Sequence, residues 1–113
     1  MEDTLKVLNA LERDGIIESY AIGGAIALVF YTEPIETEDL DVFVFLPETG
    51  GKLVSLSPIY EYLKQRGHRI EGQYIHIAGI PVQFIPAYNP LVEEAVRRAR
   101  RQPYGKTEVK VLG

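Results

Sequence analysis

The segment from Leu40 to Leu46 constrains the fold of this chain more than any other stretch of its sequence. It is rich in valine and phenylalanine, and Pro47 stops it. β-Branched and aromatic residues favour strands, because their side chains pack well on a pleated surface. Alternate side chains of a strand point to opposite faces, so the four aliphatic residues at even-numbered positions are expected to face a core. Asp39 and Asp41 are then expected to lie together on the other face.

Helix and strand patterns alternate on both sides of this segment, which predicts an α/β (α+β) fold with a mixed β-sheet flanked by helices. Leucines recur on one face of residues 4–14, and a proline directly after a capping residue predicts that two further helices begin at Ser57 and at Asn89. The expected helices cover residues 4–14, 25–31, 57–66 and 89–101, and the expected strands cover 16–22, 40–46, 74–77, 82–85 and 108–112. Residues 102–105 are expected to form a turn.

The composition is that of a soluble globular protein, with 46% hydrophobic and 25% charged residues. A chain of 113 residues is expected to form one domain, spanning residues 1–113. It has no cysteine, which excludes a disulfide framework, a thiolate zinc site and a cysteine nucleophile. The acidic N-terminus does not have the pattern of a secretory signal, and the longest apolar run, residues 25–31, is too short to span a bilayer. A cytoplasmic protein without a membrane partner is therefore expected.

Charge is distributed unevenly along the chain, although the net charge is only −4. Residues 1–50 contain 11 acidic and two basic residues, and residues 51–113 contain five acidic and ten basic residues. This asymmetry predicts one region that attracts cations and another that attracts anions.

Two motifs in the first half of the chain could carry chemistry. Gly23 and Gly24 lie between an expected strand and an expected helix, where a glycine pair lets the backbone approach a phosphate and the helix N-terminus offers N–H donors. Asp39 and Asp41 would hold their Cα atoms roughly 6.5 Å apart on one face of a strand. Two such carboxylates can bind Mg²⁺, with nucleotide phosphates completing the oxygen shell. Each motif also has a simpler interpretation, namely a strand-to-helix turn and a solvated strand start.

Taken together, the two motifs resemble the signature of the nucleotidyltransferase superfamily, which has the DNA polymerase β-like palm fold. The glycine pair is followed by a short apolar segment and then by Thr37-Glu38-Asp39-Leu40-Asp41-Val42. The likeness is strongest to minimal bacterial and archaeal members, including toxin-like abortive-infection nucleotidyltransferases. Residues 82–91, which precede the last expected helix, add to it, and the resemblance covers about residues 16–112.

The resemblance implies transfer of a nucleoside monophosphate from a nucleoside triphosphate to an acceptor, which could be RNA, a protein or a small molecule. Gly23, Gly24 and Thr37 would bind the nucleotide. Asp39 and Asp41 would be the catalytic carboxylates and would ligate Mg²⁺ or Mn²⁺.

The sequence departs from the family pattern at the third acidic position. The equivalent position on the neighbouring strand is expected to be Gln83, whose amide oxygen can bind a metal weakly but cannot act as a base. The chain also stops after the strand at which many relatives continue into a further helix, which is compatible with a minimal member, a shortened form or one half of an assembly.

Two hypotheses of different class remain. The first is a Mg²⁺-dependent enzyme, and the second is a catalytically impaired binding module of the same fold that acts with a partner chain or as a homo-oligomer. A basic run near the C-terminus has two interpretations: a solvated helix end, or a contact for a nucleic-acid acceptor or an acidic partner. This run consists of Arg97, Arg98, Arg100 and Arg101.

Overall fold

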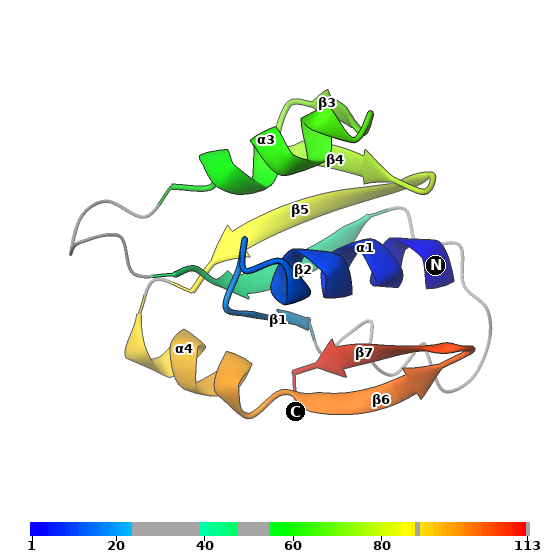
Figure 1. The fold of residues 1–113 in the computed structure, drawn as a ribbon. Coiled ribbons are helices and arrows are strands. Elements are labelled where there is room, and N and C mark those ends of the chain that lie inside the picture. The colour runs from blue at the N-terminus through cyan, green and yellow to red at the C-terminus, as the bar shows by residue number, and fades with distance from the viewer. Residues whose placement is uncertain (24–38, 48–54, 88, 113) are drawn as a thin grey trace.

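The computed structural model describes residues 1–23, 39–47, 55–87 and 89–112. In these residues the chain has a mixed α/β fold, as the sequence predicts, with three helices packed on a seven-stranded sheet (Figure 1). The helices are α1 (Glu2–Arg13), α3 (Ser57–Gln65) and α4 (Pro90–Arg97). The strands are β1 (Ser19–Ile22), β2 (Leu40–Phe45), β3 (Arg69–Glu71), β4 (Tyr74–Ile77), β5 (Ile80–Pro86), β6 (Arg100–Tyr104) and β7 (Thr107–Val111).

The sheet has the strand order β3-β4-β5-β2-β1-β7-β6. The β2–β5 and β1–β7 pairs are parallel, and the other four pairs are antiparallel. Strands β2 and β5 therefore bring residues about 40 positions apart in the sequence into neighbouring rows at the centre of the sheet.

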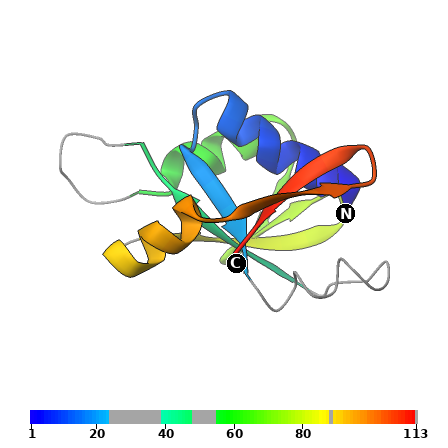
Figure 2. The ribbon, with the colours of Figure 1, turned by 90° about the horizontal axis from the view of Figure 1, so that it is seen from below.

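The sheet has two distinct faces, which β2 defines by its alternation. Leu40, Val42 and Val44 are fully buried on one face, called here the Val42 face. Leucines of α1 and aliphatic residues of α3 join them in one core cluster, and Figure 2 shows both helices on the same side of the sheet. The predicted core side of this strand is confirmed.

The opposite face, called here the Asp41 face, carries Asp41, Phe43 and Phe45 of β2. Helix α4 packs at the Phe45 end of this face, where the Arg97 guanidinium carbon lies 4.9 Å from the centre of the Phe45 ring. Figure 2 shows α4 on the side of the sheet away from α1 and α3. Asp41 lies toward the other end of β2 and is exposed.

Local sequence signals explain where two of the helices begin or end. Asn89 caps α4, because its side-chain oxygen accepts a hydrogen bond of 2.9 Å from the Val92 backbone N–H. Helix α1 ends before Gly15, which adopts a φ of +76° that a residue with a Cβ atom avoids. The expected starts at Ser57 and at Asn89-Pro90 are confirmed, and the expected strands 74–77 and 82–85 are joined as an antiparallel hairpin through Ala78-Gly79.

The C-terminal region differs from the prediction. Helix α4 ends at Arg97, so Arg100 and Arg101 are not in its last turn but in strand β6. The turn expected at residues 102–105 lies at residues 105–106 instead, because residues 100–104 pair with β7 along their whole length. Leu91 of this helix is 82% exposed. The arginines at the end of this segment favour a helix C-terminus, but pairing with β7 makes residues 100–104 a strand instead.

The N-terminal strand and one hairpin also differ from the prediction. Strand β1 begins at Ser19 rather than at Ile16, because the Ile16 and Ile17 N–H groups still donate to the Leu11 carbonyl oxygen of α1. Strand β3 was not predicted. The expected helix over residues 25–31 lies outside the described residues.

Candidate functional site

Asp41 is the best defined of the predicted site residues. It lies in β2 between the buried residues Leu40 and Val42, and its own side chain is exposed on the Asp41 face. The two buried neighbours hold the backbone in place, so the carboxylate is presented to solvent from a central strand of the sheet. A carboxylate in such a place can bind a cation without the large cost of burying its charge.

Gly23 lies next to Asp41 at the end of β1. Its N–H donates a hydrogen bond of 3.3 Å to the Asp41 carbonyl oxygen, which extends the β1–β2 pairing by one step. A Cβ atom added at Gly23 would lie 3.8 Å from the Phe43 ring, an ordinary contact distance. Gly24 and Thr37, the other two predicted nucleotide-binding residues, lie outside the described residues.

Gln83 lies directly beside Asp41 on the parallel strand β5, where the two residues are register partners. Register partners in neighbouring strands point their side chains to the same face. The structure therefore brings Asp41 and Gln83 together on the Asp41 face, with Gln83 half-buried. The position on the neighbouring strand that the resemblance assigns to a third acid is occupied here by an amide.

Asp39 is exposed and precedes β2 by one residue. Its Oδ2 atom lies 3.5 Å from the Tyr74 hydroxyl group of β4, at the outer limit of a hydrogen bond. Strands β4 and β5 pair Ile75 with Val82. If this antiparallel register is extended by one residue, Tyr74 lies opposite Gln83, and both side chains point to the Asp41 face. The Tyr74 side chain thus extends across β5 toward Asp39, and one side of the site is formed by the β4 strand.

Three charged or titratable side chains continue this face beyond Tyr74. The His76 Nε2 atom lies 3.4 Å from Glu71 Oε2, and Arg69 Nη2 lies 3.3 Å from the same oxygen. His76 is also the register partner of Pro81 on β5. The Asp41 face therefore carries a polar band that runs from β2 across β5 and β4 to β3.

The described residues limit how a metal could be held here. No three histidine, cysteine, aspartate or glutamate side chains among them lie close enough together to form a metal site. A cation between Asp39 and Asp41 would need further oxygen ligands, and the Gln83 amide or the phosphates of a nucleotide would supply the hard donors that Mg²⁺ prefers. Asp41 on β2 and Asp39 directly before it would be partial ligands of such an ion.

The four arginines of the basic run do not form one surface. Arg97 packs on Phe45, and Arg98 forms an ion pair of 2.7 Å with Glu94 of the same helix. Arg101 lies on β6, which is the edge strand opposite β3. It forms ion pairs with Glu108 at 3.3 Å and with Glu12 at 3.5 Å. Arg100 and Arg101 are neighbours on a strand and point to opposite faces.

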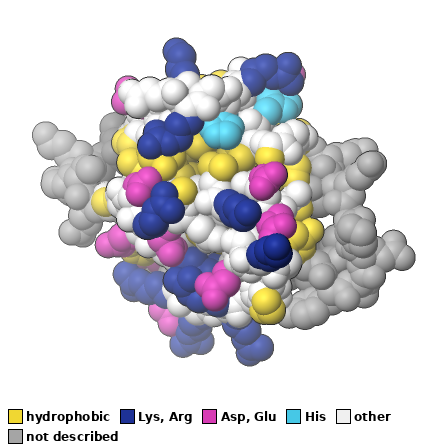
Figure 3. All heavy atoms as spheres, turned by 45° about the vertical axis from the view of Figure 1, so that its right-hand side comes forward, with side chains coloured by type: hydrophobic (Ala, Val, Ile, Leu, Met, Phe, Trp, Pro, Cys, Tyr) yellow, Lys and Arg dark blue, Asp and Glu magenta, His cyan; other side chains and the backbone are white. Residues whose placement is uncertain are grey.

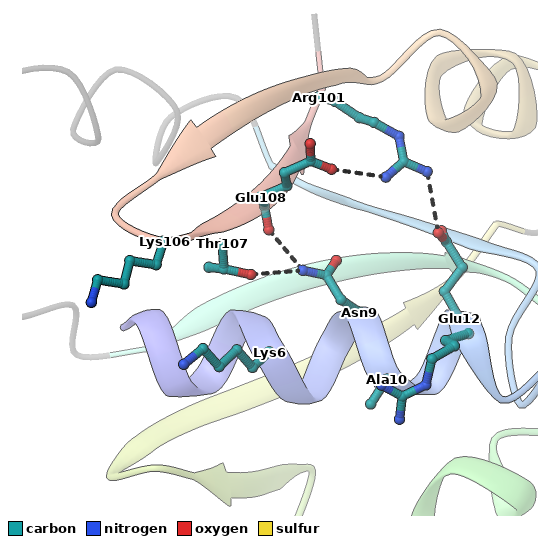
Figure 4. Close-up of a pocket in the computed structure, with 9 residues that line it drawn as sticks. Lys6, Asn9, Ala10, Glu12, Arg101, Lys106, Thr107 and Glu108 are labelled. Atoms are coloured by element: carbon teal, nitrogen blue, oxygen red, sulfur yellow. Dashed lines mark hydrogen bonds and ion pairs between the residues drawn. The ribbon is translucent and has the colours of Figure 1, made fainter.

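A groove of about 740 Å³ lies between α1 and the β6–β7 hairpin (Figure 4). Arg101 is the one predicted site residue that lines it, and the candidate phosphate and metal residues are elsewhere. Several of its polar groups are paired with one another: Asn9 donates to the Glu108 carbonyl oxygen, and Arg101 bridges the carboxylates of Glu12 and Glu108. We interpret these contacts as the attachment of the hairpin to α1.

The charge asymmetry along the sequence does not appear on the face of the described residues that Figure 3 shows. On the face seen in Figure 3, lysine and arginine side chains lie interspersed with aspartate and glutamate side chains. This arrangement does not provide the continuous basic patch that phosphate-backbone binding requires.

Tyr74 and His76 also contribute to this face, although neither was predicted to be a site residue. The alternation of Ile75 and Ile77 into the core already required both residues to point to the opposite face of the hairpin. The sequence did not reveal the strand order, in which only β5 separates β4 from β2.

We compared the chain with protein-family models, with curated proteins and with solved structures, and none of the three comparisons gives a match. The class of the molecule is therefore defined by the structure alone, as a mixed α/β fold with a polar band on one face of its sheet. None of the described helices is long and apolar enough to cross a membrane.

Proposed function

We propose that this chain is a Mg²⁺-dependent nucleotidyltransferase-like protein, which transfers a nucleoside monophosphate from a nucleoside triphosphate to an acceptor. The acceptor hydroxyl oxygen would attack the α-phosphorus atom, and the bond to the β-phosphate would break with release of pyrophosphate. Mg²⁺ would neutralise charge that develops on the phosphate oxygens. RNA, a protein hydroxyl and a small molecule remain the candidate acceptors.

One observation carries the proposal: the backbone of Gly23, the exposed carboxylate of Asp41 and the amide of Gln83 lie side by side on three neighbouring strands. Asp39 adds a second exposed carboxylate at the same end of β2. This combination offers hard oxygen ligands beside a backbone without a Cβ atom, which is the chemistry that a nucleotide phosphate and its metal ion need.

Gln83 favours a second candidate function, a nucleotidyltransferase-fold binding module with impaired catalysis. An amide cannot accept the proton that the acceptor hydroxyl must lose, and it adds no negative charge to the metal site. Such a module would bind nucleotide and act through a partner chain or a second copy.

Calorimetric titration of the four nucleoside triphosphates, with and without Mg²⁺, tests the nucleotide site. We expect Mg²⁺-dependent binding by the wild type and at least a tenfold loss in Asp41→Asn, about 1.4 kcal/mol. Asp3→Asn, which changes an exposed aspartate in α1, is the matched control and should bind as the wild type does. The proposal fails if the wild type binds none of the four nucleotides, or if Asp41→Asn binds equally well.

Pyrophosphate release separates the two candidate functions once binding is established. The enzyme hypothesis predicts release that depends on Mg²⁺ and on an added acceptor, tested with RNA, protein and small-molecule mixtures. Binding without release under all of these conditions favours the binding module.

A further inference from the structure

Strand β3 is an uncovered edge of the sheet in the described part of the chain. It ends the strand order and pairs with β4 on one side only. All three of its residues, Arg69 to Glu71, are exposed. An edge strand presents unpaired backbone N–H and C=O groups, which another strand can pair with.

The other edge of the sheet is protected against such pairing. Strand β6 carries Pro103, which has no N–H group to donate, and it carries the cations Arg100 and Arg101. Proline and cationic side chains are the devices by which natural edge strands avoid pairing. Strand β3 is only three residues long and carries one cation, Arg69, but it has no proline and its two charges are of opposite sign.

The sequence of β3 is complementary to itself in an antiparallel arrangement. If two copies pair about a two-fold axis through Ile70, Arg69 of each copy lies opposite Glu71 of the other. Directly opposed charges of opposite sign stabilise such a pair, whereas like charges destabilise it. The side chains of Arg69 and Glu71 are 70% and 66% exposed, so both can reach a second copy.

An apolar side chain lies at the centre of this edge. Ile70 is 40% exposed and, with Leu91, is one of two exposed large hydrophobic residues in the described part of the chain. Its register partner is Ile75, a core residue, so Ile70 points to the Val42 face. There it lines a groove of about 370 Å³ between β3 and α3, together with Tyr60 and Lys64.

The groove also carries charges of both signs. Glu61 and Lys64 of α3 both line it, one turn apart on the same helix. A two-fold axis through Ile70 brings the two α3 helices toward each other, since α3 lies against β3 in each copy. A closed two-fold interface requires such a patch that matches itself.

We propose that two copies of this chain associate through β3, pairing antiparallel about Ile70 so that one sheet runs through both copies. The two Ile70 side chains meet beneath the two α3 helices, and two symmetric Arg69–Glu71 pairs set the register. This interface does not depend on the proposed nucleotide site.

Sedimentation equilibrium over a wide concentration range tests the interface. We expect a reversible monomer–dimer equilibrium for the wild type and a monomer for Ile70→Lys, which places two ammonium groups at the centre of the contact. Leu91→Lys, on α4, changes the other exposed large hydrophobic residue and should leave the dimerisation constant unchanged. A monomeric wild type, or a dimeric Ile70→Lys, overturns the proposal.

Charge reversal tests the register independently of folding. Glu71→Arg and Arg69→Glu should each dimerise about tenfold more weakly than the wild type, because each creates two opposed pairs of like charge. An equimolar mixture of the two variants should associate as tightly as the wild type, since a mixed dimer restores opposite charges on both sides. A mixture that associates no better than its components overturns the proposed pairing, and circular dichroism confirms that each variant is folded.

Discussion

At the scale of single residues, the alternation of β2 decides what the site can do. Leu40 and Val42 are completely buried, and Asp41 between them is exposed. The same alternation in β5 buries Val82 and Phe84 and leaves Gln83 half-buried beside Asp41. A change of one functional side chain therefore alters the chemistry of this face without removing a residue from the core.

Gln83→Asp should raise the affinity for Mg²⁺ about tenfold in the presence of a nucleoside triphosphate, because it adds a carboxylate ligand beside Asp41. Calorimetric titration of Mg²⁺ measures the effect. Gln73→Asp, an equivalent change in the exposed turn between β3 and β4, is the control and should have no effect. An unchanged affinity in Gln83→Asp would show that residue 83 is outside the reach of the cation.

At the scale of elements, one tyrosine ties the C-terminal end of α1 to α3. The Tyr62 hydroxyl group donates a hydrogen bond of 2.6 Å to Asp14 Oδ2, and the Arg66 guanidinium carbon lies 3.5 Å from the centre of the Tyr62 ring. The hydrogen bond from Tyr62, and then the one from Arg13, lower the pKa of the Asp14 carboxyl group. This contact stabilises the packing of the two helices more strongly while Asp14 is ionised, because a carboxylate is a stronger hydrogen-bond acceptor than a neutral carboxyl group.

Tyr62→Phe should raise the pKa of Asp14 toward its ordinary value, because the variant lacks the donating hydroxyl group. A carboxyl group with a lowered pKa in the folded state contributes stability above its unfolded pKa, near 4, and this contribution is lost as the pH falls through the folded value. The wild type should therefore lose more stability than Tyr62→Phe between neutral pH and pH 3. NMR titration of the Asp14 carboxyl carbon and urea unfolding at both pH values measure these effects. An unchanged Asp14 titration in the variant would rule out this role of Tyr62.

At the scale of the whole molecule, Asn9 connects the first helix to strands from both ends of the chain. Its side-chain oxygen accepts a hydrogen bond of 2.6 Å from the Tyr20 hydroxyl group of β1, and its amide nitrogen donates to the Glu108 carbonyl oxygen of β7 at 2.8 Å. Burial raises the pKa of Tyr20 to about 12. The contribution of neutral Tyr20 is complete below its unfolded pKa, near 10, and is lost as the pH rises through the folded value.

Asn9→Ala should lower the free energy of unfolding by about 1–3 kcal/mol, because it leaves the buried Tyr20 hydroxyl group without its acceptor. Urea denaturation at pH 7 measures the change. Lys6→Ala, at an exposed position of the same helix, should shift stability by less than about 0.5 kcal/mol. A similar small effect in Asn9→Ala would mean that water replaces both hydrogen bonds.

The β4–β5 hairpin and the arginine run show which elements can be predicted from neighbouring residues and which cannot. The β4–β5 hairpin was predictable, because the turn and the alternation that form it lie within 13 residues of sequence. Strand β6 was not predictable, because its arginines are typical of the last turn of a helix and its residues form a strand only by pairing with β7. The resemblance to nucleotidyltransferases stays a prediction, and so do the nucleotide-binding and metal-binding roles of the site residues Gly23, Gly24, Thr37, Asp39, Asp41 and Gln83.

The sequence by itself determined which side of β2 is buried, that Asp39 and Asp41 are both exposed next to Leu40, and that Asn89 starts the last helix. These properties depend on side-chain alternation and capping, which act over a few neighbouring residues. Only the tertiary structure decided the strand order, the approach of Tyr74 to Asp39 and the exposed edge at β3. Those features depend on which distant strands pair and in what register. The free energy that favours one pairing over another comes from many contacts across the whole sheet.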